Sequence, residues 1–128
     1  MKIEHIALYT QRLEEMKNFY TRYFSGQSND KYVNARKGFS SYFISFSSGA
    51  RLELMQQEGI TPAATNNKQR LGLIHFAFSV GSRAAVDALT ETLRTQGFKV
   101  TGEPRSTGDG YYESCIADPD GNLVEITE

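Results

Sequence analysis

The 128-residue sequence predicts an α+β fold of two tandem βαβββ modules, and the main evidence is an internal repeat. A His-x-Ala pattern inside an apolar run occurs at His5 and again at His75, and the chain has no other histidine. A glutamate flanked by aliphatic residues occurs at Glu53 and again at Glu125, near the end of each half. The two halves therefore share one plan.

Each half fits one helix placed between its first strand and three later strands. Apolar residues recur at helical spacing in 11–24 and again between Ser82 and Gly97. Thr10 and Ser82 are candidate N-caps, and Gly26 and Gly97 are expected to end the helices. Period-two or apolar runs predict strands at 3–8, 31–36, 41–46 and 51–55, and at 73–78, 99–102, 111–117 and 123–127.

The sequence between the halves has the composition of a connecting loop. Residues 57–71 contain Gly59, Pro62, Asn66 and Asn67 and almost no apolar periodicity. We therefore expect one domain over 1–128, with a first module at 1–56, a linker at 57–71 and a second module at 72–128.

Charge and cysteine content exclude several classes of function. Fourteen basic and fifteen acidic residues give a net charge of −1, which argues against nucleic-acid binding and binding to anionic membranes. The N-terminal segment is too polar for a signal peptide, so we expect a cytoplasmic protein. Cys115 is the only cysteine and lies in a predicted strand, where a small buried side chain is a better interpretation than a nucleophile.

Strand alternation places both histidines and both glutamates on one kind of face. The aliphatic neighbours of His5, Glu53, His75 and Glu125 must take the face packed on the helix, which leaves these four side chains on the opposite face. Two imidazoles and two carboxylates suit a divalent ion, with Zn²⁺, Ni²⁺, Co²⁺, Mn²⁺ and Fe²⁺ all compatible. A subset of two histidines and one carboxylate also suits a non-haem iron site, so the metal stays open.

Several motifs together resemble a known family. His-Ile-Ala at 5–7, Phe19-Tyr20 through Gly26, and the turn at 118–122 leading into Glu125 are similar to the vicinal oxygen chelate superfamily, which includes glyoxalases, bleomycin resistance proteins and dioxygenases. The resemblance covers nearly the whole chain and implies the glyoxalase/bleomycin resistance/dihydroxybiphenyl dioxygenase fold, with the two modules forming a cupped mixed sheet. It also implies a homodimer that binds a small-molecule substrate.

Within the superfamily the chain most resembles bacterial-type glyoxalase I, or lactoylglutathione lyase. His5, Glu53, His75 and Glu125 match its four metal ligands, with Ni, Co or Zn as the expected ion and Mn or Fe as further options. The resemblance implies conversion of the hemithioacetal of a 2-oxoaldehyde, such as methylglyoxal, and a thiol into a 2-hydroxyacyl thioester. Glu125 would be the catalytic base, with Glu53 able to serve the opposite face of the substrate.

The substrate side departs from the bacterial enzyme at one position. Tyr9 stands where that enzyme commonly has an arginine that holds a glutathione carboxylate, which leaves the thiol open. We expect Tyr9, Arg105 and Tyr111 to contact substrate. Arg36, Lys37 and Arg51 are further candidate cations, and the glycine-rich segment 106–112 is either a ligand cover or a simple hairpin loop.

Two other functions remain compatible with the sequence. One is a non-haem Fe²⁺ dioxygenase of the same superfamily that uses both histidines and Glu125. The other is a metal-free module that binds a small molecule, such as an antibiotic, in a cleft lined by aromatic side chains. The lining would come from some of the residues Tyr9, Tyr42, Phe43, Tyr111 and Tyr112.

Overall fold

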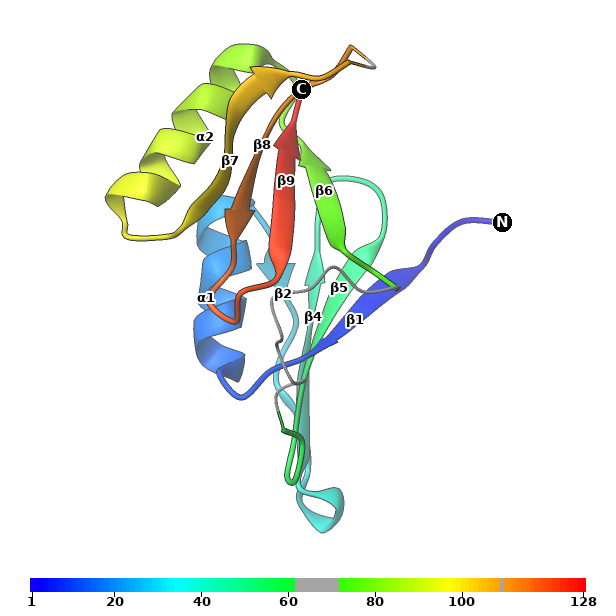
Figure 1. Ribbon diagram of the computed structural model, residues 1–128. Coiled ribbons are helices and arrows are strands. Elements are labelled where there is room, and N and C mark those ends of the chain that lie inside the picture. Colours follow the sequence, from blue (N-terminus) through cyan, green and yellow to red (C-terminus); the bar gives the residue numbers. More distant parts are fainter. Residues whose placement is uncertain (62–71, 109) are drawn as a thin grey trace. The chain divides into compact units, whose positions relative to one another are not determined.

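The computed structural model describes residues 1–61, 72–108 and 110–128. The chain divides into two compact units, Met1–Asn66 and Asn67–Glu128. Residues 62–71, most of the expected linker, lie outside the described residues. Within the described residues, each unit contains one α-helix and one mixed sheet, which confirms the predicted α+β fold of two modules (Figure 1).

The first unit contains a five-stranded sheet with strand order β1-β5-β4-β2, and β3 also pairs with β4. β1 and β5 are parallel, and the other pairs are antiparallel. Its elements are β1 (His5–Tyr9), α1 (Leu13–Tyr23), β2 (Gln27–Ser28), β3 (Tyr32–Asn34), the 3₁₀ turn η1 (Ala35–Lys37), β4 (Phe39–Ser45) and β5 (Arg51–Gln57).

The second unit repeats this arrangement with a four-stranded sheet in the order β6-β9-β8-β7. The parallel pair is now β6 and β9, while β9, β8 and β7 run antiparallel to one another. Its elements are β6 (His75–Ser79), α2 (Arg83–Thr95), β7 (Val100–Ser106), β8 (Tyr112–Ala117) and β9 (Leu123–Thr127).

The helix of each unit covers one face of its own sheet. α1 contacts β4 and β5, and α2 contacts β7, β8 and β9. The core residues are almost entirely removed from solvent, as Leu54 and Met16 in the first unit and Ile126 and Leu93 in the second show. The other face of each sheet, called here the helix-free face, carries the side chains at the alternate strand positions.

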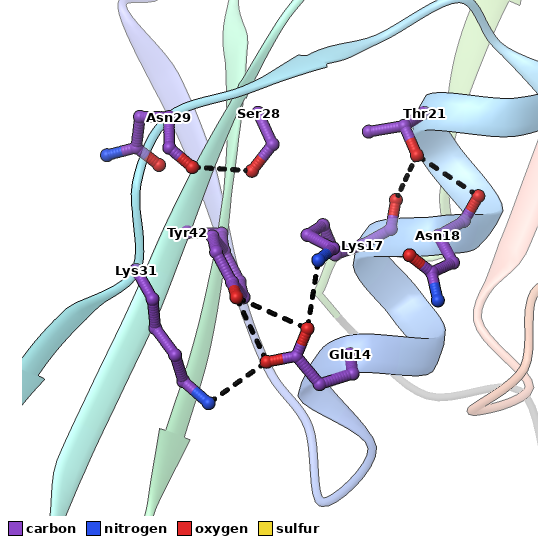
Figure 2. Close-up of polar contacts among 8 residues, drawn as sticks. All are labelled: Glu14, Lys17, Asn18, Thr21, Ser28, Asn29, Lys31 and Tyr42. Atoms are coloured by element: carbon purple, nitrogen blue, oxygen red, sulfur yellow. Dashed lines mark hydrogen bonds and ion pairs between the residues drawn. The ribbon is translucent and has the colours of Figure 1, made fainter.

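A polar cluster fixes α1 against β4 (Figure 2). The Tyr42 hydroxyl donates to both carboxylate oxygens of Glu14, at 3.0 and 3.2 Å. Lys17 and Lys31 each donate an ammonium hydrogen bond to the same carboxylate, at 2.9 and 3.0 Å. Hydrogen bonds from Lys17, Lys31 and Tyr42 lower the pKa of Glu14 to about 2. The cluster therefore ties the first turn of the helix to the sheet through an ionised carboxylate.

The helix starts and ends agree only in part with the sequence prediction. Ser82 is the N-cap of α2, as predicted, and its hydroxyl accepts from the Ala85 amide at 3.2 Å. Thr10 is not the N-cap of α1, because the helix begins later with Arg12 at that position. The Thr10 hydroxyl instead accepts from the Arg12 amide at 2.8 Å.

The two helices end in different ways. At the end of α2, Gly97 has φ +87°, and the Phe98 amide bonds to the Leu93 carbonyl at 3.0 Å, which is a Schellman motif. At the end of α1, the residue with positive φ is Ser25, at +54°. Gly26 meets a different requirement, because a Cβ there would overlap the side chain of Ile44.

Strand boundaries also differ from the prediction. β1 and β6 begin two residues later than expected, at His5 and His75. β5 extends to Gln57 and β7 to Ser106, because each strand has an antiparallel partner over that length. Among the described residues, no helix has the length and apolar content needed to cross a membrane.

Candidate functional site

The first unit places His5 and Glu53 together on its helix-free face. β1 and β5 are parallel, and their register pairs Ala7 with Glu53, so His5 lies diagonally opposite the carboxylate. His5 Nε2 is 3.8 Å from Glu53 Oε2. The Glu53 side chain is 16% exposed, against 42% for His5. The small side chain of Ala7 leaves space beside both groups.

The second unit repeats this pair with His75 and Glu125. β6 and β9 are parallel, and their register pairs Ala77 with Glu125. His75 Nε2 lies 3.2 Å from Glu125 Oε2, and the Glu125 side chain is 21% exposed. The structure thus pairs His5 with Glu53 in the first unit and His75 with Glu125 in the second.

The chemistry of each pair fits a divalent ion. One imidazole nitrogen and one carboxylate oxygen face each other, and both are ligands for Zn²⁺, Ni²⁺, Co²⁺, Mn²⁺ and Fe²⁺. Each pair supplies two donors, and within the described residues no three His, Cys, Asp or Glu side chains form a group that could hold a metal.

The surroundings of the first pair include Glu4, which the sequence analysis missed. Glu4 Oε2 is 2.5 Å from His5 Nδ1, and Glu4 Oε1 accepts from Arg51 Nε at 2.8 Å. The hydrogen bond from His5, with a further one from Arg51, lowers the pKa of Glu4. The Arg51 guanidinium lies over the ring of Phe43, 4.2 Å from its centroid. In the sequence, the feature that could have identified Glu4 is an acidic residue directly before a histidine that starts a strand.

The surroundings of the second pair include small side chains. Cys115 is the cross-strand partner of Glu125, and Gly102 is the cross-strand partner of Cys115. Burial raises the pKa of the Cys115 thiol, and the carboxylates of Glu125 and Glu113 add to this effect. A raised pKa disfavours the thiolate, which agrees with a packing role for this cysteine. In the same strand as Glu125, Thr127 Oγ1 is buried and has no hydrogen-bond partner among the described residues.

The three residues expected to contact substrate lie in different places. Tyr9 ends β1 on the helix-free face, and its hydroxyl donates to Gln57 Oε1 at 3.3 Å. Arg105 lies in β7, with Nη2 3.6 Å from a carboxylate oxygen of Glu113. Tyr111 directly precedes β8 and is 55% exposed.

Two of the five candidate lining residues, Tyr42 and Tyr112, bond to side chains on the helices. The Tyr42 hydroxyl bonds to Glu14 of α1, and the Tyr112 hydroxyl bonds to Asp87 of α2 at 2.8 Å. Both tyrosines therefore lie on the helix side of their sheets and cannot line a cleft on the helix-free face. The loop expected at 106–112 is shorter in the structure, because Ser106 and Tyr112 already pair as the ends of β7 and β8. Asp109 lies outside the described residues.

Comparison with known proteins identifies the family. The family model described as the glyoxalase/bleomycin resistance protein/dioxygenase superfamily matches residues 2–126. The chain belongs to this superfamily. Its members include glyoxalase I enzymes, and they commonly bind a divalent metal ion.

Individual relatives agree with this assignment. An uncharacterized protein of Bacillus subtilis, YqjT, is 29% identical over 127 residues, which cover 97% of this chain and 96% of the relative. A glyoxalase family protein from Enterococcus faecalis is 25% identical, with a TM-score of 0.79, and the match covers 99% of this chain and 97% of that one.

Glyoxalase I structures share the superfamily fold at lower identity. The trypanothione-dependent glyoxalase I of Leishmania major is 21% identical, with a TM-score of 0.77, over 100% of this chain and 86% of that one. Glyoxalase I from Zea mays is 23% identical, with a TM-score of 0.77. That match covers 98% of this chain but 44% of the maize chain, so this chain spans less than half of the plant protein.

Proposed function

We propose that the chain is a divalent-metal-dependent lyase of the glyoxalase I type. It would convert the hemithioacetal of a 2-oxoaldehyde, such as methylglyoxal, and a thiol into a 2-hydroxyacyl thioester. The observation that carries the proposal is the repeated histidine-glutamate pair, which occupies the same register in both units. Glutathione or another thiol would be the second substrate.

His5, Glu53, His75 and Glu125 would together hold one ion, within one chain or across a homodimer. When bound, a divalent ion supplies Lewis acidity that stabilises negative charge on the oxygen atoms of the substrate. The histidines would remain neutral ligands throughout the reaction. Ni, Co and Zn are the preferred ions for this set of nitrogen and oxygen donors, and Mn and Fe are compatible with it.

Glu125 would act as the general base. Its carboxylate would take the proton from the hemithioacetal carbon next to the carbonyl and return it to the former carbonyl carbon, so that the product is an isomer of the adduct. No oxidant or reductant is consumed. The low exposure of the Glu125 side chain limits competition from water for the proton. Glu53, whose side chain is 16% exposed, would act as the base for substrates that bind with their opposite face towards it.

The thiol part of the substrate would contact Tyr9, Arg105 and Tyr111. Arg105 would offer its guanidinium to an acidic group on the thiol, although that group would compete with the ion pair to Glu113. Tyr9 can donate one hydrogen bond but carries no charge. The assay should therefore include thiols with fewer carboxylates than glutathione.

Metal stoichiometry tests the site. Elemental analysis of purified protein, after chelator treatment and refilling with Ni²⁺, Co²⁺, Zn²⁺ or Fe²⁺, should give about one ion per chain. His75→Ala should lose the ion, whereas Glu91→Gln, which alters an exposed carboxylate on α2, should keep it. No stoichiometric ion under any refilling condition would refute the proposal and favour a small-molecule binding module.

Activity tests the base. With methylglyoxal and a series of thiols, thioester formation should fall by about 10²-fold or more in Glu125→Gln and remain normal in Glu91→Gln. Full isomerase activity in metal-loaded Glu125→Gln would exclude Glu125 as the base. Oxygen consumption with a catechol, in iron-loaded protein without isomerase activity, would instead favour a dioxygenase.

A further inference from the structure

His5 is held at both nitrogen atoms of its ring. Nε2 faces Glu53, the other member of its pair, while Nδ1 lies 2.5 Å from Glu4 Oε2. An ionised carboxylate can only accept hydrogen bonds, so the proton shared with Glu4 belongs to Nδ1. In the neutral ring this leaves the lone pair on Nε2, the nitrogen that points at Glu53.

Glu4 is itself fixed by Arg51. The Arg51 guanidinium contacts Glu4 Oε1 through both Nε and Nη2. The Arg51 amide also donates to the Glu4 carbonyl at 2.9 Å, so backbone and side chain hold the same two residues together.

Phe43 closes the arrangement around the imidazole. Its ring receives the Arg51 guanidinium on one face. Its centroid is also 5.6 Å from that of His5, at an interplanar angle of 84°. His5, Glu4, Arg51 and Phe43 therefore form a closed ring of contacts, which we call the His5 support.

Among its described residues, the second unit has no equivalent support. Ile74 precedes His75, Leu123 pairs with His75 where Arg51 pairs with His5, and Cys115 pairs with Glu125 where Phe43 pairs with Glu53. None of these side chains can accept a hydrogen bond from a ring nitrogen as a carboxylate does. The ligand pairs repeat between the units, but the contacts that orient the histidine do not.

We infer that Glu4 is a positioning residue for His5, anchored by Arg51, and that it presents Nε2 of His5 as a preformed ligand. This rests on the proposed function, because the ligand is for the divalent ion proposed above. A carboxylate on the far ring nitrogen fixes the tautomer and the ring orientation of a metal-binding histidine, and its loss costs about 10- to 100-fold in metal affinity. The two halves of the centre would therefore differ, one preorganised and the other not.

The tautomer can be read in metal-free protein. Long-range ¹H–¹⁵N NMR spectra at a pH where His5 is neutral should show the proton on Nδ1, and Glu4→Ala should shift it towards Nε2. The signals of His75 should stay unchanged. An Nε2 proton on His5 in the unmodified chain, or a tautomer unaffected by Glu4→Ala, would overturn the inference whether or not the protein binds metal.

Metal affinity gives a second readout. Competition of Zn²⁺ and Co²⁺ between the protein and a chromophoric chelator should show Kd raised about 10- to 100-fold in Glu4→Ala, and the Co²⁺ absorption spectrum should change. Glu91→Gln should leave both unchanged. Glu4→Gln, which can still accept through its amide oxygen, should recover part of the affinity. An unchanged Kd in Glu4→Ala refutes the positioning role, whereas absence of metal binding in the unmodified chain refutes the proposed function alone.

Discussion

Replacing Glu14 by glutamine should remove a pH-dependent part of the stability of the first unit. The carboxylate accepts hydrogen bonds from Tyr42, Lys17 and Lys31, and its pKa falls from 4.5 to about 2 (Figure 2). At about 1.36 kcal/mol per pKa unit, this lowering corresponds to a ceiling of roughly 3 kcal/mol. Because the Glu14 side chain is 53% exposed, solvent screening reduces this ceiling, and we expect about 1 kcal/mol.

The direction of the pH dependence follows from the lowered pKa of Glu14. Above pH 4.5 the carboxylate is ionised in both the folded and the unfolded chain, and its contacts contribute fully to the free energy of unfolding. As the pH falls from 4.5 towards 2, the unfolded chain binds the proton first, so this contribution is lost. Below about pH 2 both states are protonated, and Glu14 differs little from glutamine.

Urea unfolding, followed by circular dichroism at several pH values, checks the prediction for Glu14→Gln. The difference in unfolding free energy between the unmodified chain and Glu14→Gln should be about 1 kcal/mol at pH 7 and shrink steadily below pH 4.5. Glu15→Gln is the matched control, since Glu15 has an exposed ion pair with Arg12 at 3.2 Å and should cost less than about 0.5 kcal/mol. A difference that stays constant from pH 7 to pH 3 would refute the electrostatic explanation.

Three further substitutions test packing and helix ends, each by urea unfolding at pH 7. Gly26→Ala should destabilise the protein by about 1–3 kcal/mol, because the new Cβ overlaps Ile44; an unchanged midpoint would mean that Ile44 moves freely. Gly97→Ala should cost about 1 kcal/mol, since alanine disfavours the positive φ that ends α2, and a gain in stability would contradict this. Ser114→Ala should cost about 1 kcal/mol through loss of its buried 2.6 Å hydrogen bond to Thr90, and a neutral effect would show that the bond contributes nothing.

Much of the fold was predictable because side-chain alternation and the repeat are both local signals. Leu52 and Leu54, on either side of Glu53, are buried as predicted. Helix ends were less predictable, because they depend on tertiary contacts. Gly26 was predicted to end the first helix, but Ser25 adopts the left-handed conformation there, and the glycine is required by the approach of Ile44.

The candidate site was predictable to the extent that the repeat carries it. Both histidine-glutamate pairs were expected, since alternation fixes the face of each residue. Glu4 was missed because strict alternation would put it on the face opposite to His5. β1 begins only at His5, so Glu4 lies outside the strand and its carboxylate can reach Nδ1. The contribution of Arg51 depends on a parallel register that no short stretch of sequence specifies.

The positions of Tyr42 and Tyr112 also follow from strand alternation. Both were chosen as aromatic lining by residue type, although alternation with the buried residues Ile44 and Ser114 predicts the helix side for both. Their hydroxyl groups reach carboxylates on the helices, which gives each tyrosine a structural role.

The differences between the two units bear on how the carboxylates divide their roles. Glu53 lies beside Phe43, whose ring is held by His5 and Arg51. Glu125 has Ala77 and Cys115 as its cross-strand neighbours, and both side chains are small. A general base must move between the site that takes the proton and the site that receives it, and a small-residue environment permits that movement. Both carboxylates have an alanine on one side, so the units differ here in Phe43 beside Glu53 and Cys115 beside Glu125. Under the proposed function, the smaller neighbour would leave the carboxylate of Glu125 more room to move than that of Glu53.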